Sequence, residues 1–304
     1  MSLAFILFRQ IGIMFVLMAA GFIFYRRQMI TVQGSADMGK ILLYLVIPVV
    51  IINSFWVERT SERTMQLVHS AVIAGIAMAA AIVISVAVFG TKRGVSCFSS
   101  AFSNAGFIGI PLVQAVLGSD AVFHISVMIV LINILQWTVG VYVMTKDASI
   151  MKPGKIIRNP IVIAVMTGLL LYFSGLKKPD VASSLLQTVS GLNTPLAMMV
   201  SGVYLAQSHL SDLWKKKETW YVCMFRLVII PMVTTVIFRF IPFGSMELRL
   251  AILIAAACPV GSNVAIFAQQ YQQDYREAVE HVCLSTLLCL ITLPLLTGVA
   301  AGLL

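Results

Sequence analysis

The chain has 304 residues, of which 60% are hydrophobic and 11% are charged, and its formal net charge is +9. A soluble domain is about 45–50% apolar and about 25% charged, so this composition excludes a soluble protein and indicates one membrane domain over residues 1–304. The basic excess could indicate nucleic acid as a partner. Its lysines and arginines gather in short loops beside apolar runs, however, so we expect a lipid bilayer and no nucleic acid.

The hydrophobic runs predict an all-α fold of ten membrane-spanning helices, because the length accommodates about ten spans of about 20 residues. The second run is short for a span and is expected to begin before Ile41. The predicted spans are Leu3–Tyr25, Ile41–Trp56, Gln66–Phe89, Val95–Gly118, Ala121–Met144, Asn159–Leu176, Ser183–Gln207, Thr219–Phe240, Met246–Gln270 and Ala278–Leu303.

Helix breakers interrupt the fourth and ninth spans at mid-length. Proline lacks an amide donor and glycine relaxes the backbone, and backbone freed inside a membrane is tolerated only where protein or a water-filled cavity satisfies it. A matched pair of broken spans indicates the central binding site of a transporter. The residues concerned are Asn104, Gly106, Gly109 and Pro111 in the fourth span, and Cys258, Pro259, Gly261, Ser262 and Asn263 in the ninth.

Basic residues are distributed unequally between alternate loops, and the richer side is expected to be cytoplasmic, which places both termini outside the cell (inner) membrane. The arginines that follow the first apolar run favour a retained span over a cleaved signal peptide. The richer side holds Arg26, Arg27, Lys40, Lys92, Arg93, Lys146, Lys152, Lys155, Arg158, Lys215, Lys216, Lys217 and Arg276, and the other holds Arg59, Arg63, Lys177, Lys178, Arg239 and Arg249.

The prolines of the two halves repeat at a nearly constant spacing. Pro48 and Pro195 are 147 positions apart, and Pro111 and Pro259 are 148 positions apart. Each half, residues 1–150 and 151–304, holds five predicted spans, so the second half must enter the membrane from the opposite side. The pattern predicts two inverted five-helix repeats, an architecture found in many alternating-access carriers.

The segments Ser103–Leu112 and Cys258–Asn263 resemble the signature segments of the auxin efflux carrier family, and the resemblance extends over nearly the whole chain, including Pro48 and Arg226 with Pro231. It implies a scaffold of spans 1, 2, 6 and 7, a mobile core of spans 3–5 and 8–10, a crossing of spans 4 and 9, and a homodimer formed through the scaffold. Plant members insert a long hydrophilic loop between spans five and six. This chain has only residues 145–158 there, so it resembles the bacterial permeases of small carboxylates.

At such a crossing, the N-terminal ends of the half-helices expose amide donors and partial positive charge, which favours an anion such as a carboxylate. Asn104 could contact substrate or only satisfy freed backbone. Ser262 or Asn263 could cap the second half of the ninth span, since such side chains accept from early helix amides. Pro111 and Pro259 are expected to set shape rather than to contact substrate.

Arg226 is the clearest charge inside a predicted span, and such a charge needs a compensating partner. That partner is either a substrate carboxylate or carbonyl groups at a break, and both interpretations stay open. Asn53 is a weaker candidate that could face the core from the scaffold. The other polar groups, Gln114, Asn133 and Gln136, are typical of interhelical hydrogen bonds.

No carboxylate is predicted deep in the membrane, which weakens a carboxylate proton relay and leaves the coupling ion open. The five cysteines fall in predicted spans and form no metal-type pair. The four histidines, His69, His124, His209 and His281, are expected at span ends or in loops and have no metalloprotease spacing, so no metal or cofactor is expected.

The sequence therefore predicts a secondary transporter of a small organic anion that works by alternating access, and not an enzyme. A sodium-coupled symporter of related fold is the alternative within transport. A channel and a membrane-embedded enzyme are more distant alternatives, because no nucleophile–base motif, no paired deep acids and no phosphate-binding loop are found.

Overall fold

The computed structural model describes residues 3–147, 154, 158–207 and 214–304, which excludes Lys152, Lys155 and His209. The regular elements in these ranges are helices, apart from one isolated bridge. In chain order they are α1 (Leu3–Arg26), α2 (Val32–Ile41), η1 (Leu42–Val46), α3 (Ile47–Phe55), α4 (Ser61–Phe89), η2 (Thr91–Arg93), α5 (Gly94–Ala101), η3 (Ala105–Gly109), α6 (Ile110–Leu117), α7 (Val122–Leu135), η4 (Gln136–Gly140), α8 (Val141–Thr145), α10 (Pro160–Ser174), α11 (Asp180–Ser190), α12 (Asn193–Gln207), α14 (Lys217–Met224), η6 (Phe225–Ile229), α15 (Ile230–Arg239), α16 (Met246–Ala257), α17 (Asn263–Gln270) and α18 (Tyr275–Leu303).

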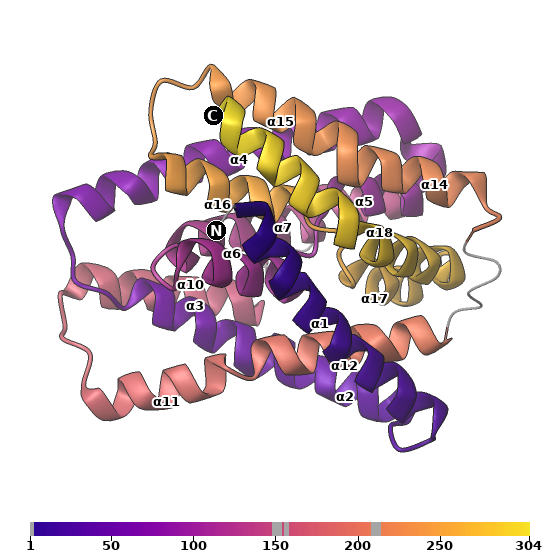
Figure 1. The fold of residues 1–304 in the computed structure, drawn as a ribbon, viewed down its shortest axis with the longest axis horizontal. Helices are drawn as coiled ribbons and strands as arrows, with labels where there is room; N and C mark the ends of the chain where they lie inside the picture. Colours follow the sequence, from indigo (N-terminus) through magenta and orange to yellow (C-terminus); the bar gives the residue numbers. More distant parts are fainter. Residues whose placement is uncertain (1–2, 148–153, 155–157, 208–213) are drawn as a thin grey trace.

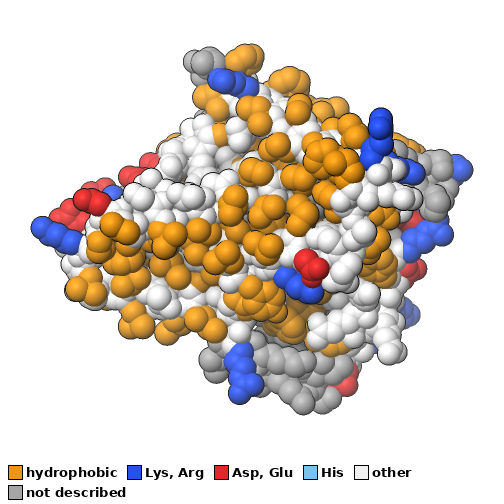
Figure 2. Space-filling view, turned by 90° about the horizontal axis from the view of Figure 1, so that it is seen from below, with side chains coloured by type: hydrophobic (Ala, Val, Ile, Leu, Met, Phe, Trp, Pro, Cys, Tyr) orange, Lys and Arg blue, Asp and Glu red, His pale blue; other side chains and the backbone are white. Residues whose placement is uncertain are grey.

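Large apolar side chains lie on the outside of this bundle. Seven helical segments of the described chain are long and apolar enough to cross a membrane, and Ala105–Leu117 and Pro160–Ser174 are shorter apolar helices. Hydrophobic side chains cover the middle of the face in Figure 2, and charged side chains lie mainly towards its margins. Leu170 is 69% exposed and Val16 is 71% exposed, as expected of side chains that face lipid. The chain is an all-α membrane protein.

Three helical segments widen into a π-turn directly before a proline. Proline cannot donate a hydrogen bond to the carbonyl four residues earlier, and its ring clashes with that carbonyl. The π-turns η1, η3 and η6 precede Pro48, Pro111 and Pro231, which each stand in the first turn of the next α-helix. A π-turn relieves the clash while the helix continues, so these prolines deform their spans without ending them.

The predicted boundaries agree with the helices to within a few residues, with two informative differences. The second span begins earlier than Ile41, as expected, because α2, η1 and α3 form one segment from Val32 to Phe55. The seventh is interrupted by a turn at Gly191 and Leu192 between α11 and α12. None of the residues of α11 is buried, and this helix packs against α3 on the outside of the bundle.

Two histidines expected at span boundaries are buried. His124 is 5% exposed and bonds to Ser70 Oγ through Nδ1 at 2.9 Å. His281 is fully buried, because α18 begins at Tyr275, three residues before the predicted start, and carries it into the bundle.

The helices of the predicted scaffold pack in two close pairs. In Figure 1, α1 crosses over α12, and α3 and α10 lie side by side. A Cβ atom at Gly202 would lie 2.0 Å from Met18 O, and one at Gly21 would lie 2.2 Å from Met199 O. Backbones in α1 and α12 approach this closely only through small residues, as in other membrane helix pairs.

We expect Gly21→Ala to separate α1 from α12 and to destabilise the protein by about 1–3 kcal/mol, which is typical of overpacking. Thermal stability in detergent, followed by fluorescence-detected size exclusion, measures the loss. Gly12→Ala on the same helix is the control, because a Cβ there meets nothing within 4 Å. Equal stability of the two variants would contradict the close packing.

Candidate functional site: the crossing of two broken helices

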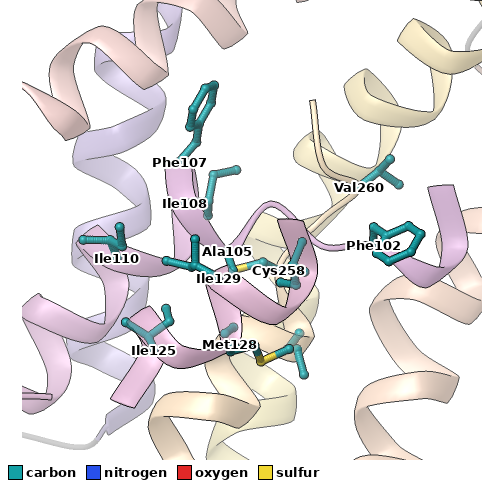
Figure 3. Packing of buried hydrophobic residues seen from close by; sticks show 14 of the residues in the cluster. Phe102, Ala105, Phe107, Ile108, Ile110, Ile125, Met128, Ile129, Cys258 and Val260 are labelled. Carbon is teal, nitrogen blue, oxygen red and sulfur yellow. The ribbon is translucent and has the colours of Figure 1, made fainter. Parts of the chain in front are cut away.

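The two broken spans meet at their breaks. The first break separates α5 from η3, and the second separates α16 from α17. Across them, Asn104 N–H donates to Pro259 O at 2.8 Å and Gly261 N–H donates to Phe102 O at 3.0 Å, which makes an antiparallel bridge between Ser103 and Val260. Each break therefore satisfies backbone groups that the other has freed. Figure 3 shows Phe102 and Val260 beside this crossing, with Ala105 and Cys258 nearby.

Two glycines are closely packed around the crossing. A Cβ at Gly261 would lie 3.1 Å from Ser103 O, so a side chain there would press on the bridge. A Cβ at Gly109 would lie 2.9 Å from Ile125 Cδ1 and 3.4 Å from Cys258 Sγ. These glycines permit close approach of backbone and neighbouring side chains, whereas Gly106 is more open, with Ile47 Cδ1 at 3.4 Å.

Polar side chains join the breaks to each other and to η4, which continues α7. Asn104 Nδ2 donates to Ser262 Oγ at 3.1 Å, and Asn263 Nδ2 donates to Gln136 Oε1 at 3.0 Å. The expectation that Ser262 or Asn263 caps α17 is wrong for Ser262, which stands at the N-cap position but makes no cap hydrogen bond and instead accepts from Asn104. The Asn263 amide is directed to Gln136. The interhelical role predicted for Gln136 is confirmed by its bond to Asn263.

A small cavity of about 30 Å³ lies at the crossing, which is room for about one or two water molecules. We call it the crossing cavity. Ser103 lines it, is 4% exposed, and its hydroxyl has no hydrogen-bond partner among the described residues. Five of the predicted site residues line this cavity, namely Asn104, Gly106, Gly261, Ser262 and Asn263.

The other predicted site residues lie elsewhere. Gly109, Pro111, Cys258 and Pro259 do not line the crossing cavity, and they shape the helices around it. Asn53 lies in a different cavity, where Lys178 Nζ donates to its Oδ1 at 2.9 Å.

Arg226 is 1% exposed and faces the C-terminal ends of the two half-helices that enter the crossing. Its guanidinium donates to Ser100 O and Ala101 O at 3.0 Å each, at the end of α5, and also to Ala256 O at the end of α16. Helix C-termini carry partial negative charge and unpaired carbonyls, so one cation satisfies both ends. Of the two partners left open by the sequence, the structure places Arg226 on carbonyl groups.

The N-terminal ends of η3 and α17 remain for another partner. Ile108 N–H makes the first bond of its segment, to Asn104 O at 3.0 Å, so the amides of residues 105–107 precede the helical ladder. The crossing thus separates charge: cationic Arg226 covers the C-terminal ends, and the partially positive N-terminal ends face the cavity residues.

Sequence reasoning missed Ser103 and Asn193 as site residues. Asn193 begins α12, is 2% exposed, and donates from Nδ2 to Gly106 O at 3.3 Å. Asn133 was expected to bond between helices, but its Nδ2 donates to Ile129 O of its own helix at 2.8 Å while the residue lines the crossing cavity. The signal in the sequence that could have identified Ser103 and Asn193 is that each is a polar residue within or beside an apolar run.

A second cavity of about 790 Å³ approaches the crossing. We call it the large cavity. Ile47 lines the crossing cavity and Val50, one turn later on α3, lines the large cavity. Its ionisable lining has both signs of charge: the cations are Arg63 and Lys178, and the carboxylates are Glu58, Glu62, Asp120 and Glu247. Partial burial lowers the pKa of Lys178 from its ordinary value. Helices of the predicted scaffold and of the predicted core both line this cavity. The scaffold helices are α3, α11 and α12, and the core helices include α4, α6 and α7.

Comparison with known proteins finds one relative and one family. A protein of Rhizobium meliloti (strain 1021) named "Putative malonate transporter" is 23% identical over 205 residues, which cover 64% of this chain and 63% of that protein. The chain thus spans less than two thirds of the length of this relative.

The model of the family described as membrane transport protein matches residues 6–153 and 144–297, which together cover most of the chain. A family of this description transports and does not catalyse a chemical conversion. The chain belongs to the membrane transport protein family, the family of the auxin efflux carriers.

Proposed function

We propose that this protein is a secondary transporter that moves a small organic anion, a mono- or dicarboxylate of the malonate class, across the cell membrane by alternating access. The observation that carries the proposal is the buried crossing, where N-terminal helix ends and the side chains of Ser103, Asn104 and Asn263 surround one cavity. The name of the Rhizobium relative supports the substrate class.

A carboxylate suits this cavity for electrostatic reasons. Each helix N-terminus carries about +0.5 charge, and its free amides point at a bound anion. The unpartnered Ser103 hydroxyl and the Asn104 amide supply further donors. Arg226 already serves three carbonyl oxygens, so we assign the anion to the helix ends and not to the guanidinium.

Alternating access is supported by where the cavities lie. The large cavity leads from solvent to within one turn of the crossing, along the boundary between the proposed scaffold and the proposed core. The crossing cavity is too small for a dicarboxylate in this conformation, so binding requires the core to shift against the scaffold.

The inverted repeat remains part of the proposal. Packing of α1 on α12 joins spans 1 and 7, and packing of α10 on α3 joins spans 6 and 2. An inverted repeat relates these two pairs to one another. In the second pair, Gly168 on α10 makes room for the Phe55 side chain of α3, since a Cβ there would lie 2.9 Å from Phe55 Cβ. A homodimer through these scaffold helices is proposed on the family resemblance alone.

We expect proteoliposomes loaded with unlabelled malonate to take up labelled malonate transiently by counterflow. Asn104→Ala and Asn263→Ala should each slow this uptake about tenfold, which corresponds to about 1.4 kcal/mol, close to the lower limit of about 1.5 kcal/mol for a hydrogen bond to a charged group. Gln270→Ala is the control, because it is exposed on the same helix as Asn263.

Folded protein that exchanges neither malonate nor any other small carboxylate would refute the transport proposal. Repeating the assay without sodium distinguishes sodium-independent transport from sodium-coupled symport, because loss of counterflow would select the sodium-coupled alternative.

We expect Arg226→Gln to destabilise the substrate-free protein by about 3–5 kcal/mol, because two helix ends would lose their buried cation. Arg239→Gln is the control, since that side chain is exposed and donates to Leu303 O near the surface. Thermal unfolding without substrate is the measurement. Wild-type stability combined with lost malonate binding would instead assign Arg226 to the substrate.

The proposed orientation places the loop after α3 outside and the loop after α4 in the cytoplasm. An impermeant maleimide added to intact cells should therefore label Glu58→Cys and leave Lys92→Cys unlabelled. The five native cysteines are buried and give a low background. The reverse labelling pattern would invert the topology.

A further inference from the structure

A group of ionisable side chains lies at the end of the molecule away from the large cavity. The large cavity is lined by Arg63 and Gln66 at the start of α4, and this helix then runs for 29 residues, about 43 Å, to Phe89. From there η2 leads into the start of α5, which packs against the start of α18. This group includes none of the predicted binding residues and does not line the large cavity.

His281 is the buried centre of the group. Its side chain is fully buried, and Nδ1 lies 3.0 Å from Ser99 Oγ on α5. Nε2 is buried and has no hydrogen-bond partner in the part of the chain that the structure describes, and it lies 3.7 Å from Glu277 Oε1. An imidazole in this position can bind a proton at Nε2 without giving up its contact with Ser99.

Glu277 connects this imidazole to solvent. Its side chain is 28% exposed, and it accepts a hydrogen bond from Ser96 Oγ at 2.8 Å. It stands four residues before His281, and residues at this spacing face each other on a helix. A proton can therefore reach the buried ring by way of a carboxylate that touches water.

Two other carboxylates near the pair have partners of opposite sign. Glu280 lies 2.6 Å from Lys216 Nζ and 3.2 Å from Arg276 Nε, and Glu218 pairs with Arg93 at 3.2 Å. Among the described residues, no lysine or arginine forms an ion pair with Glu277. The titratable groups around the pair come from several elements. Arg93 belongs to η2, and Lys216 and Glu218 stand at the start of α14. On α18 itself they are Asp274, Tyr275, Arg276, Glu280 and Cys283, and Tyr204 of α12 lies near Tyr275 and Cys283.

The pair is linked to both breaks of the crossing. Glu277, His281 and Ser285 follow one another at intervals of four along one face of α18, and Ser285 Oγ accepts from Val260 N–H at 3.0 Å. On α5, Ser99 directly precedes Ser100 and Ala101, whose carbonyls bind Arg226. The three residues Glu277, His281 and Ser285 extend about 12 Å along α18, from solvent to the second break.

We infer that Glu277 and His281 form a proton-binding site, and that its occupancy controls the movement of the crossing. Proton binding at Nε2 places an imidazolium beside the Glu277 carboxylate and leaves the other ionic pairs unchanged. The new charge alters how α18 holds α5 and the second break. The inference rests on the proposed transport function and adds to it a dependence on pH at the end of the protein where α18 begins.

The test measures malonate counterflow in proteoliposomes while pH is varied separately on each side. The wild-type rate should follow pH on one side only, and both His281→Gln and Glu277→Gln should exchange malonate without that dependence. Glu277→Gln decides the question if the buried histidine variant does not fold. His69→Gln is the matched control on α4, since that ring packs on Phe243 and should leave the profile unchanged.

Retention of the wild-type pH profile in either folded variant would overturn the inference and leave the transport proposal intact. A second measurement does not depend on transport: in histidine-labelled protein, one of four imidazole resonances should be lost in His281→Gln, and its titration should be displaced by Glu277→Gln. A His281 resonance that does not titrate, or one that Glu277→Gln leaves unmoved, would also overturn it. Absence of counterflow at every pH, with a resonance that titrates as expected, would instead refute the proposed function alone.

Discussion

Backbone groups that are freed inside hydrocarbon must find partners, and this constraint explains the centre of the molecule. An unpaired amide or carbonyl in a membrane costs several kcal/mol. The first break donates from Asn104 N–H and accepts at Phe102 O, and the second break provides the matching groups. Ser285 Oγ accepts from Val260 N–H, so a third helix completes the set. Two breaks in one membrane protein are stable because they lie together.

The same constraint divides the crossing into two chemically different halves. Carbonyl ends need a donor that remains charged in a buried site, and arginine suits this role because its guanidinium presents several donors in a fixed plane. The Arg226 guanidinium donates hydrogen bonds to Ser100 O, Ala101 O and Ala256 O at the same time. Amide ends have no comparable resident anion among the described residues. The arrangement therefore favours a visiting anion at one half and a permanent cation at the other.

The sequence predicted the helical spans and the two breaks because each depends on local chemistry. Long apolar runs mark membrane helices, and Pro111 and Pro259 mark lost hydrogen bonds. The partners of side chains were harder to predict, because they depend on which helices meet. Ser262 follows a break and resembles a cap in sequence, yet the approach of Asn104 from 158 positions away takes its hydroxyl. His281 is expected in a loop or at a span boundary from its place in the sequence, and only the packing of α5 on α18 reveals that it is buried.

Contacts within the two helix groups differ in kind from contacts between them, and this difference bears on how the protein could move. Within the proposed scaffold, α1 and α12 touch backbone to backbone at Gly21 and Gly202, which resists sliding. Between the groups the contacts are made through side chains. At the crossing, Asn193 donates to Gly106 O at 3.3 Å and Ile47 lies against the open surface of Gly106. Farther away, hydroxyl pairs join α3 to α7 and α4 to α10. An apolar side chain against a glycine can be displaced at little cost, and one hydrogen bond contributes only about 0.5–1.5 kcal/mol net. The boundary that would slip in the proposed alternating access passes directly beside the crossing cavity, and its contacts at that point are ones that can be exchanged at little cost.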